Sequence, residues 1–163
     1  MDSEVLKTFM DGRVTMYNRP DFIGSDPILI PHRFSAKEDK EISAFLAATI
    51  AWGKRSIIIS NAEKLMDIME NQPHAFITQA SDTDLVKLES FVHRTFNATD
   101  LLYFVEALRQ LYKGHGGLEG AFSSGFQKYD STAEAIASFR ALFLSFGAPE
   151  RTGKHVANPL KGS

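Results

Sequence analysis

Apolar residues recur every three or four positions along most of this chain, and this spacing is the feature that most constrains its fold. The spacing is that of helices that each bury one face. No run alternates apolar and polar residues over five or more positions, as a half-buried strand would. The sequence therefore predicts an all-α protein, a compact bundle of about seven helices without a sheet.

Capping residues and helix breakers mark the expected ends of these helices. A first helix with an apolar stripe from Leu6 to Tyr17 ends at Arg19-Pro20, because the residue before a proline disfavours helical backbone. Residues 26–34 contain two prolines and are expected to form an extended connection packed on the core. The later helices are predicted to begin at the caps Ser35, Ser56, Ser81, Asn97 or Thr99, and Ser131 or Thr132.

Length and composition fit a single domain followed by a tail. The 163 residues are 44% hydrophobic and include 13 phenylalanines, which is enough to fill a substantial core. We expect the helical domain to span residues 1–148. Residues 149–163 are polar, basic and rich in breakers, and we expect a flexible tail that leads toward a further C-terminal part.

Several classes of site and location are disfavoured. The chain has no cysteine, and its five histidines are dispersed without a ligand spacing, so no metal site and no cofactor are expected. The acidic N-terminus does not resemble a signal peptide, and no run approaches the roughly 20 apolar residues of a membrane span. We expect a cytoplasmic protein with no membrane partner and no coherent acid–base set for small-molecule catalysis.

The junction between the second and third predicted helices is the strongest candidate site. Trp52, Gly53, Lys54 and Arg55 form a short turn, and Ser56 opens the next helix. On one interpretation, Trp52 is only the last core residue of its helix and both cations are solvated. On the other, the cations meet phosphates beside a helix N-terminus, whose free N–H groups favour anions, and Trp52 stacks on a base.

Three segments of the chain resemble an uncharacterised bacterial family of longer proteins, known as a domain of unknown function. They are YNRPDFIGSDPILIPHRF, EISAFLAATIAWGKRSIIISNAEKLM and RTGKHVANPLKGS, and together they correspond to the N-terminal two-thirds of that family. The family is itself distantly similar to helix-hairpin-helix DNA glycosylases of the endonuclease III type. This resemblance implies an incomplete endonuclease III-like helical core.

The resemblance also limits the chemistry that is expected. Trp52 stands where the glycosylases place a polar residue that fills the gap left by an extruded base, so the wedge role does not carry over directly. Their catalytic carboxylate and amine match no residue in this chain. The resemblance therefore implies no catalytic residue and no glycosylase activity within residues 1–163.

Two functional hypotheses follow. The first is a DNA-binding portion of a DNA-repair-like protein, in which a set of polar, basic and aromatic residues contacts the nucleic acid: Trp52, Gly53, Lys54, Arg55, Ser56, Arg151, Lys154 and Lys161. The alternative is a non-catalytic helical interaction module that packs on a protein partner or on its own further C-terminal region.

Overall fold

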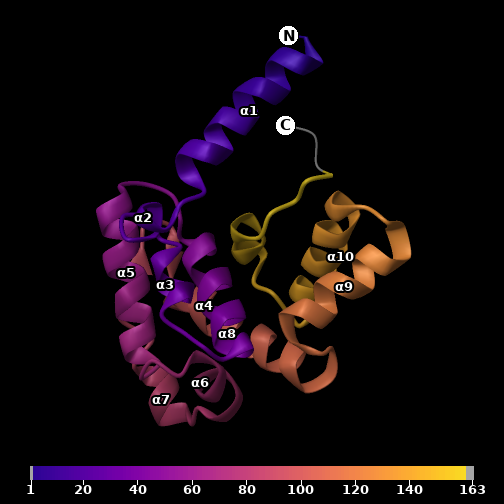
Figure 1. Cartoon of the computed structure of the whole chain (residues 1–163). Coiled ribbons are helices and arrows are strands. Elements are labelled where there is room, and N and C mark those ends of the chain that lie inside the picture. The colour runs from indigo at the N-terminus through magenta and orange to yellow at the C-terminus, as the bar shows by residue number, and fades with distance from the viewer. Residues whose placement is uncertain (1, 161–163) are drawn as a thin grey trace.

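The computed structural model describes residues 2–160 and confirms the all-α prediction (Figure 1). Within this range ten α-helices, one 3-10 helix and one two-stranded hairpin follow each other along the chain. The elements are α1 (Ser3–Tyr17), α2 (Pro20–Ile23), α3 (Leu29–His32), α4 (Lys37–Thr49), α5 (Arg55–Ile68), α6 (Pro73–Gln79), α7 (Asp82–Val86), β1 (Val92–His93), β2 (Phe96–Asn97), α8 (Ala98–Gly114), α9 (Gly117–Tyr129), α10 (Thr132–Ser145) and η1 (Glu150–His155).

Helices α4 and α8 lie in the middle of the fold. Helices α5 and α6 pack on one side of this pair, and α9 and α10 pack on the other (Figure 1). Phenylalanines join the two sides: the Phe45 ring stacks on Phe104 with centroids 5.6 Å apart, and both rings meet Phe143 edge-on. The arrangement follows from the 3.6-residue stripes, since each long helix except α1 turns its apolar face into this core.

The long helices were predictable because their start signals are local. Asn97 accepts hydrogen bonds from the N–H groups of Thr99 and Asp100, and Asp100 bonds back to the Asn97 N–H, which forms a capping box for α8. Ser81 and Asp84 form the same motif at α7, and Ser131 caps α10. These three predicted caps are confirmed.

Two other predicted caps and the extended connection are wrong. Helix α4 begins after Ala36 and α5 after Lys54, and neither start has a side-chain cap, so Ser35 and Ser56 do not have that role. In the segment 26–34, α3 forms a single helical turn and buries Ile30. Pro31 is tolerated there because the first turn of a helix leaves its N–H groups unpaired.

The helix predicted to begin at the Ser81 cap is present but ends at Val86. Helix α7 stops after five residues, and the chain turns into the antiparallel hairpin of β1 and β2, in which His93 pairs with Phe96. Arg94, between the strands, has a positive φ of 55°. The apolar spacing of this stretch suits a helix, but burial of Phe91, His93 and Phe96 against the core selects a hairpin.

Residues 150–156 differ from the expected unpacked tail. They form η1 and bury Thr152 and Val156, and the Arg140 guanidinium donates to the carbonyl groups of Gly153 and Val156. The polar composition of this segment reflects hydrogen bonds to buried partners, which composition alone does not reveal. A domain boundary at residue 148 stays a prediction.

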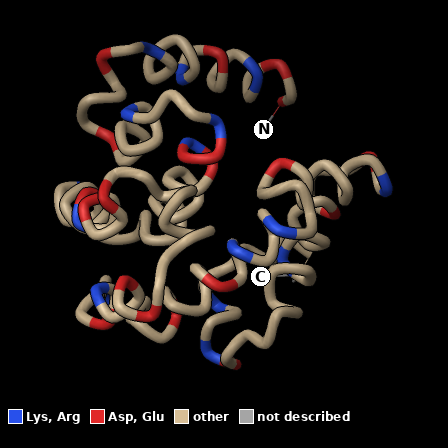
Figure 2. The backbone as a smooth tube through the Cα atoms, turned by 90° about the horizontal axis from the view of Figure 1, so that it is seen from below, with Lys and Arg blue, Asp and Glu red and all other residues tan. Residues whose placement is uncertain are grey.

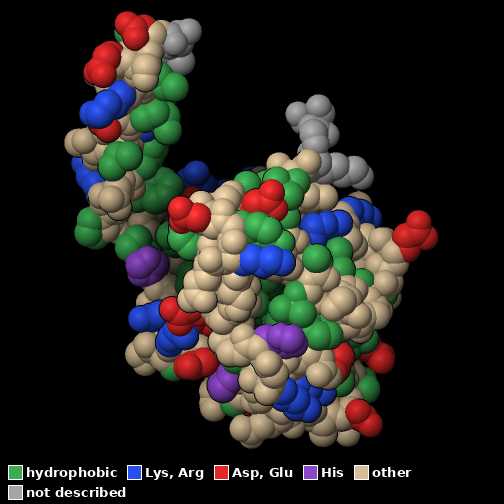
Figure 3. Space-filling model, turned by 90° about the vertical axis from the view of Figure 1, so that its right-hand side faces the viewer, with side chains coloured by type: hydrophobic (Ala, Val, Ile, Leu, Met, Phe, Trp, Pro, Cys, Tyr) green, Lys and Arg blue, Asp and Glu red, His purple; other side chains and the backbone are tan. Residues whose placement is uncertain are grey.

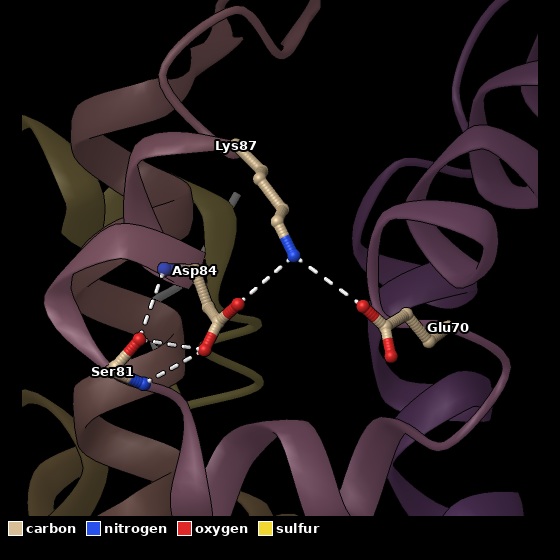
Figure 4. A network of polar contacts seen from close by, with 4 residues as sticks. All are labelled: Glu70, Ser81, Asp84 and Lys87. Carbon is tan, nitrogen blue, oxygen red and sulfur yellow. Dashed lines mark hydrogen bonds and ion pairs between the residues drawn. The ribbon is translucent and has the colours of Figure 1, made fainter.

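A polar network connects α7 to the end of α5 (Figure 4). The Lys87 ammonium lies 2.9 Å from an Asp84 carboxylate oxygen and 3.4 Å from Glu70 Oε1. The Lys87 ammonium, together with the hydroxyl and N–H groups of Ser81, lowers the pKa of Asp84 to about 2.

Within residues 2–160, no helix combines the length and apolar character that crossing a membrane requires.

Candidate nucleic-acid interface

The Trp52 corner, defined here as Trp52–Ser56, is exposed at the junction of α4 and α5. Gly53 has a φ of +122°, a backbone conformation that residues with a Cβ rarely adopt, and this conformation turns the chain between the helices. Lys54 is the N-cap of α5 and supplies no side-chain acceptor. Within the described chain, the N–H groups of Arg55 and Ser56 have no acceptor, so the helix presents two free donors.

The hairpin of β1 and β2 holds Trp52 in place from 41 residues further along the chain. The Arg94 guanidinium lies over the indole ring, 5.1 Å from its centroid, and the His93 ring meets the indole edge-on. His93 Nε2 lies 3.2 Å from the Trp52 carbonyl oxygen, and His93 Nδ1 lies 2.8 Å from Asn61 Nδ2. A neutral His93 that donates from Nε2 and accepts at Nδ1 satisfies both contacts.

The two predicted cations of the corner differ in their surroundings. Lys54 makes no ion pair with any residue in the range 2–160. Arg55 is 56% exposed but lies 3.9 Å from an Asp26 carboxylate oxygen, 3.4 Å from the Ser25 carbonyl oxygen, and over the Phe22 ring. The corner is thus open to solvent, and the charge of Arg55 is partly compensated within the protein.

A cavity of about 550 Å³ opens beside Arg55. Its walls are formed by small and apolar side chains of α3, α4, α5 and the loops next to them: Pro27, Ile28, Pro31, Ala44, Ala47, Ala48, Ala51 and Ile58. Asp26, Gly53 and Arg55 are the remaining lining residues. The Trp52 corner therefore borders an apolar hollow with a cation at its edge.

One residue of the tail, Arg151, reaches the turn of the same hairpin. The Arg151 guanidinium donates to the Thr95 carbonyl oxygen at 2.8 Å and lies 3.3 Å from an Asp100 carboxylate oxygen. Arg94 and Arg151 therefore both lie at the turn between β1 and β2, and Arg94 also covers Trp52. Lys154 is exposed on η1, and Lys161 lies outside the described residues.

Asp100 is the buried anchor of this tail. Its carboxylate is fully buried and accepts the Thr152 hydroxyl at 2.8 Å in addition to the Asn97 N–H. His155 Nε2 lies 3.4 Å from the same carboxylate without hydrogen-bond alignment, and it has no other partner among the described residues. Burial lowers the pKa of His155, and the nearby Asp100 charge opposes this shift only in part.

Sequence reasoning missed Arg94 and Asp100. Arg94 became a functional candidate only through the hairpin, which brings it over Trp52. Asp100 had a local signal, its position three residues after the Asn97 cap, but that signal accounts for a cap and not for an anchor. Basic and acidic residues are interspersed along the whole described fold (Figure 2), and the net charge of the chain is only −2. Local groupings such as this one therefore matter more than the net charge.

Residues 26–163 match the family described as "Protein of unknown function (DUF2400)". The match covers every element from α3 onward and all the predicted site residues. No curated protein matches the chain. No solved structure matches it.

Proposed function

This chain belongs to the DUF2400 family of proteins of unknown function, and we propose that its Trp52 corner is a nucleic-acid-binding surface. The observation that carries the proposal is the gathering of cations around one exposed aromatic ring. Arg94 lies over Trp52, Lys54 and Arg55 follow it in the chain, and Arg151 reaches the same hairpin. We further propose that the surface belongs to a helix-hairpin-helix, DNA-repair-like protein.

The chemistry of the corner suits a phosphate backbone with an unpaired base. Cationic side chains and free helix N–H groups bind phosphate oxygens without reading sequence. Aromatic faces stack on bases of any identity, which favours single strands or distorted duplexes. Because Arg94 already covers one face of the indole, a base that stacks there displaces Arg94, whose charge is then available to the adjacent phosphate.

Fluorescence measurements test the proposal directly. Trp52 is the only tryptophan of the chain, so its emission reports on the corner itself. We expect single-stranded and mismatched oligonucleotides to quench this emission and to bind with an affinity that falls steeply with salt. In Lys54→Glu/Arg55→Glu we expect weaker binding and a log–log salt slope that is smaller by about one for each phosphate that is no longer neutralised.

A matched control separates the site from general charge effects. Lys64→Glu/Lys113→Glu makes the same change in net charge at exposed positions outside the corner, and its affinity is expected to stay closer to that of the parent chain. Equal losses of affinity in the two double variants would show that the Trp52 corner is not the binding surface. If the parent chain shows no detectable binding at low salt, the nucleic-acid proposal is wrong.

A second candidate function is a helical interaction module for a protein partner or for a further C-terminal region of the same protein. The observation that favours it is the exposed apolar face of α1, where Phe9 and Met10 are 51% and 52% exposed. This face is separate from the Trp52 corner, so the two functions are compatible and are tested independently.

A further inference from the structure

Helix α1 projects from the body of the protein and buries none of its side chains (Figures 1 and 3). Apolar side chains run along one side of this helix, and charged side chains lie on the other (Figure 3). The apolar stripe consists of Leu6, Phe9, Met10, Val14 and Tyr17, all exposed. Lys7 and Asp11 form an ion pair beside it.

A stripe of this kind is the pattern of a helix that packs against a partner. Isolated helices of about 15 residues are marginal in water, and most helical stability comes from packing of the apolar face. Helix α1 has 15 residues and contains Gly12, which has a low helix propensity. Its apolar face therefore calls for a covering surface that the rest of the described chain does not supply.

The base of α1 adjoins an apolar hollow of about 590 Å³. The hollow lies in the elbow between α1 and α2, where the rings of Tyr17 and Phe22 meet edge-on at 5.6 Å. Ile23 and Ile28 extend its apolar wall. The hollow is also lined by three basic residues, Arg13, Arg19 and His32. No acidic residue of the described chain lines it.

The first turn of α1 has the complementary character. It carries the acids Asp2 and Glu4 next to the apolar Val5 and Leu6. An acidic, apolar helix tip is complementary in polarity and charge to an apolar hollow with a basic rim, in which Arg19 also pairs with Asp21 at 3.0 Å. Within one copy, the tip and the hollow lie at opposite ends of the same straight helix, so they cannot meet.

We propose that two copies of this chain pair through α1, antiparallel about a two-fold axis near Met10. The helix has seven residues on each side of this position, so Ser3 of one copy lies opposite Tyr17 of the other. Leu6 then faces the partner's Val14, and the acidic tip of each copy enters the hollow of the other. The same two surfaces are used twice, as a closed two-fold dimer requires.

Sedimentation velocity over a wide concentration range tests the dimer. We expect a monomer–dimer equilibrium in the parent chain and a monomer in Leu6→Asp/Met10→Asp. Thr8→Asp/Thr15→Asp adds the same charge to the polar side of α1 and is expected to dimerise like the parent chain. Since none of these four residues is buried, urea midpoints that are unchanged at a concentration at which the parent chain is monomeric will show that the core is intact.

A charge exchange makes the test specific for antiparallel self-pairing. Glu4→Arg at the tip of α1 and Arg19→Glu at the rim of the hollow each create two repulsive contacts in a homodimer and are expected to weaken it about tenfold. When the two variants are mixed, both contacts of the heterodimer are attractive, so dimerisation is expected to return. A parent chain that stays monomeric, whether or not it binds lipid vesicles, or a mixture that fails to recover, would overturn the proposal. It is tested separately from the nucleic-acid proposal, because none of the substituted residues belongs to the Trp52 corner.

Discussion

The guanidinium of Arg94 covers the indole of Trp52 at 5.1 Å, and the two residues come from elements 42 positions apart in the chain. The contact joins a hairpin turn to a helix–helix junction. Both sides of the contact have a residue with positive φ: Gly53, whose missing Cβ leaves room for Arg94, and Arg94 itself. The candidate site is therefore a tertiary feature, built where two tight turns meet.

Gly53→Ala is expected to lower the free energy of unfolding by about 1–3 kcal/mol. The φ of +122° is unfavourable for alanine, and its Cβ would lie 3.0 Å from Arg94 Nη1. Gly24→Ala is the control, because Gly24 has a φ of −62° and an alanine methyl there would meet no heavy atom within 4 Å. Urea denaturation measures both variants. Similar losses of unfolding free energy in Gly53→Ala and Gly24→Ala would mean that the Trp52 corner does not depend on the backbone conformation of Gly53.

Asp100→Ala is expected to release the tail from the domain. The substitution leaves the Thr152 hydroxyl and the Asn97 N–H without their buried acceptor, which costs about 2–3 kcal/mol of unfolding free energy. Trypsin is expected to cut after Arg151 and Lys154 faster in the variant, since both residues lie on η1. Glu89→Ala removes an exposed acid and should change neither quantity appreciably. Unaltered cleavage in Asp100→Ala would show that the carboxylate does not hold the tail.

His155 is expected to make the domain less stable as the pH falls below neutrality. Burial lowers its pKa in the folded protein, so below about pH 6.5 the unfolded chain binds more protons and the stability decreases. The groups that face it are Asp100, Arg151 and Lys154. We expect the stability difference between the parent chain and His155→Gln to shrink from pH 7.5 to pH 5.5, by at most about 1.4 kcal/mol per pH unit.

The comparison with His155→Gln isolates this residue, because the other four histidines are common to both proteins. Urea unfolding at several pH values supplies the difference. Parallel stability curves for the two proteins would contradict a lowered pKa for His155.

Asp84 is expected to make the stability of the protein depend on pH in a more acidic range. Its folded pKa of about 2 lies below the value of about 3.9 for an unfolded chain, so its contribution is present above about pH 4 and is lost as the pH falls through 2. The stability advantage of the parent chain over Asp84→Asn should therefore disappear between these values. Asp67→Asn, at an exposed position of α5, should follow the parent curve throughout. A constant advantage of the parent chain down to pH 2 would exclude the ionised capping box.

The sequence predicted the long helices and much of the core, because their signals are local. Ile58, Ala62, Leu65 and Met66 of α5 are all buried together with Met69 at its C-cap, since residues three and four apart share one helix face. The short elements could not be predicted in this way. Helices α2 and α3 have four residues each, too few for a periodic pattern, and the hairpin strands have only two.

The candidate site was only partly predictable. The Trp52 corner followed from a local pattern, an aromatic and two cations between two helical stripes, and the structure places these residues on an exposed turn. The partial pairing of Arg55 with Asp26 and the cover of Trp52 by Arg94 did not follow, because each joins residues distant in the chain. Whether the corner binds nucleic acid stays a prediction.

The sequence by itself determined that this chain is helical and where its exposed junction lies, because periodicity and turn chemistry act over a few residues. Only the tertiary structure decided what surrounds that junction. Long-range burial turned residues 92–97 into a hairpin, set Arg94 on Trp52, and packed the polar segment 150–156 on Asp100. Such pairings depend on which buried groups find partners across 40 or more residues, and no local pattern encodes that choice.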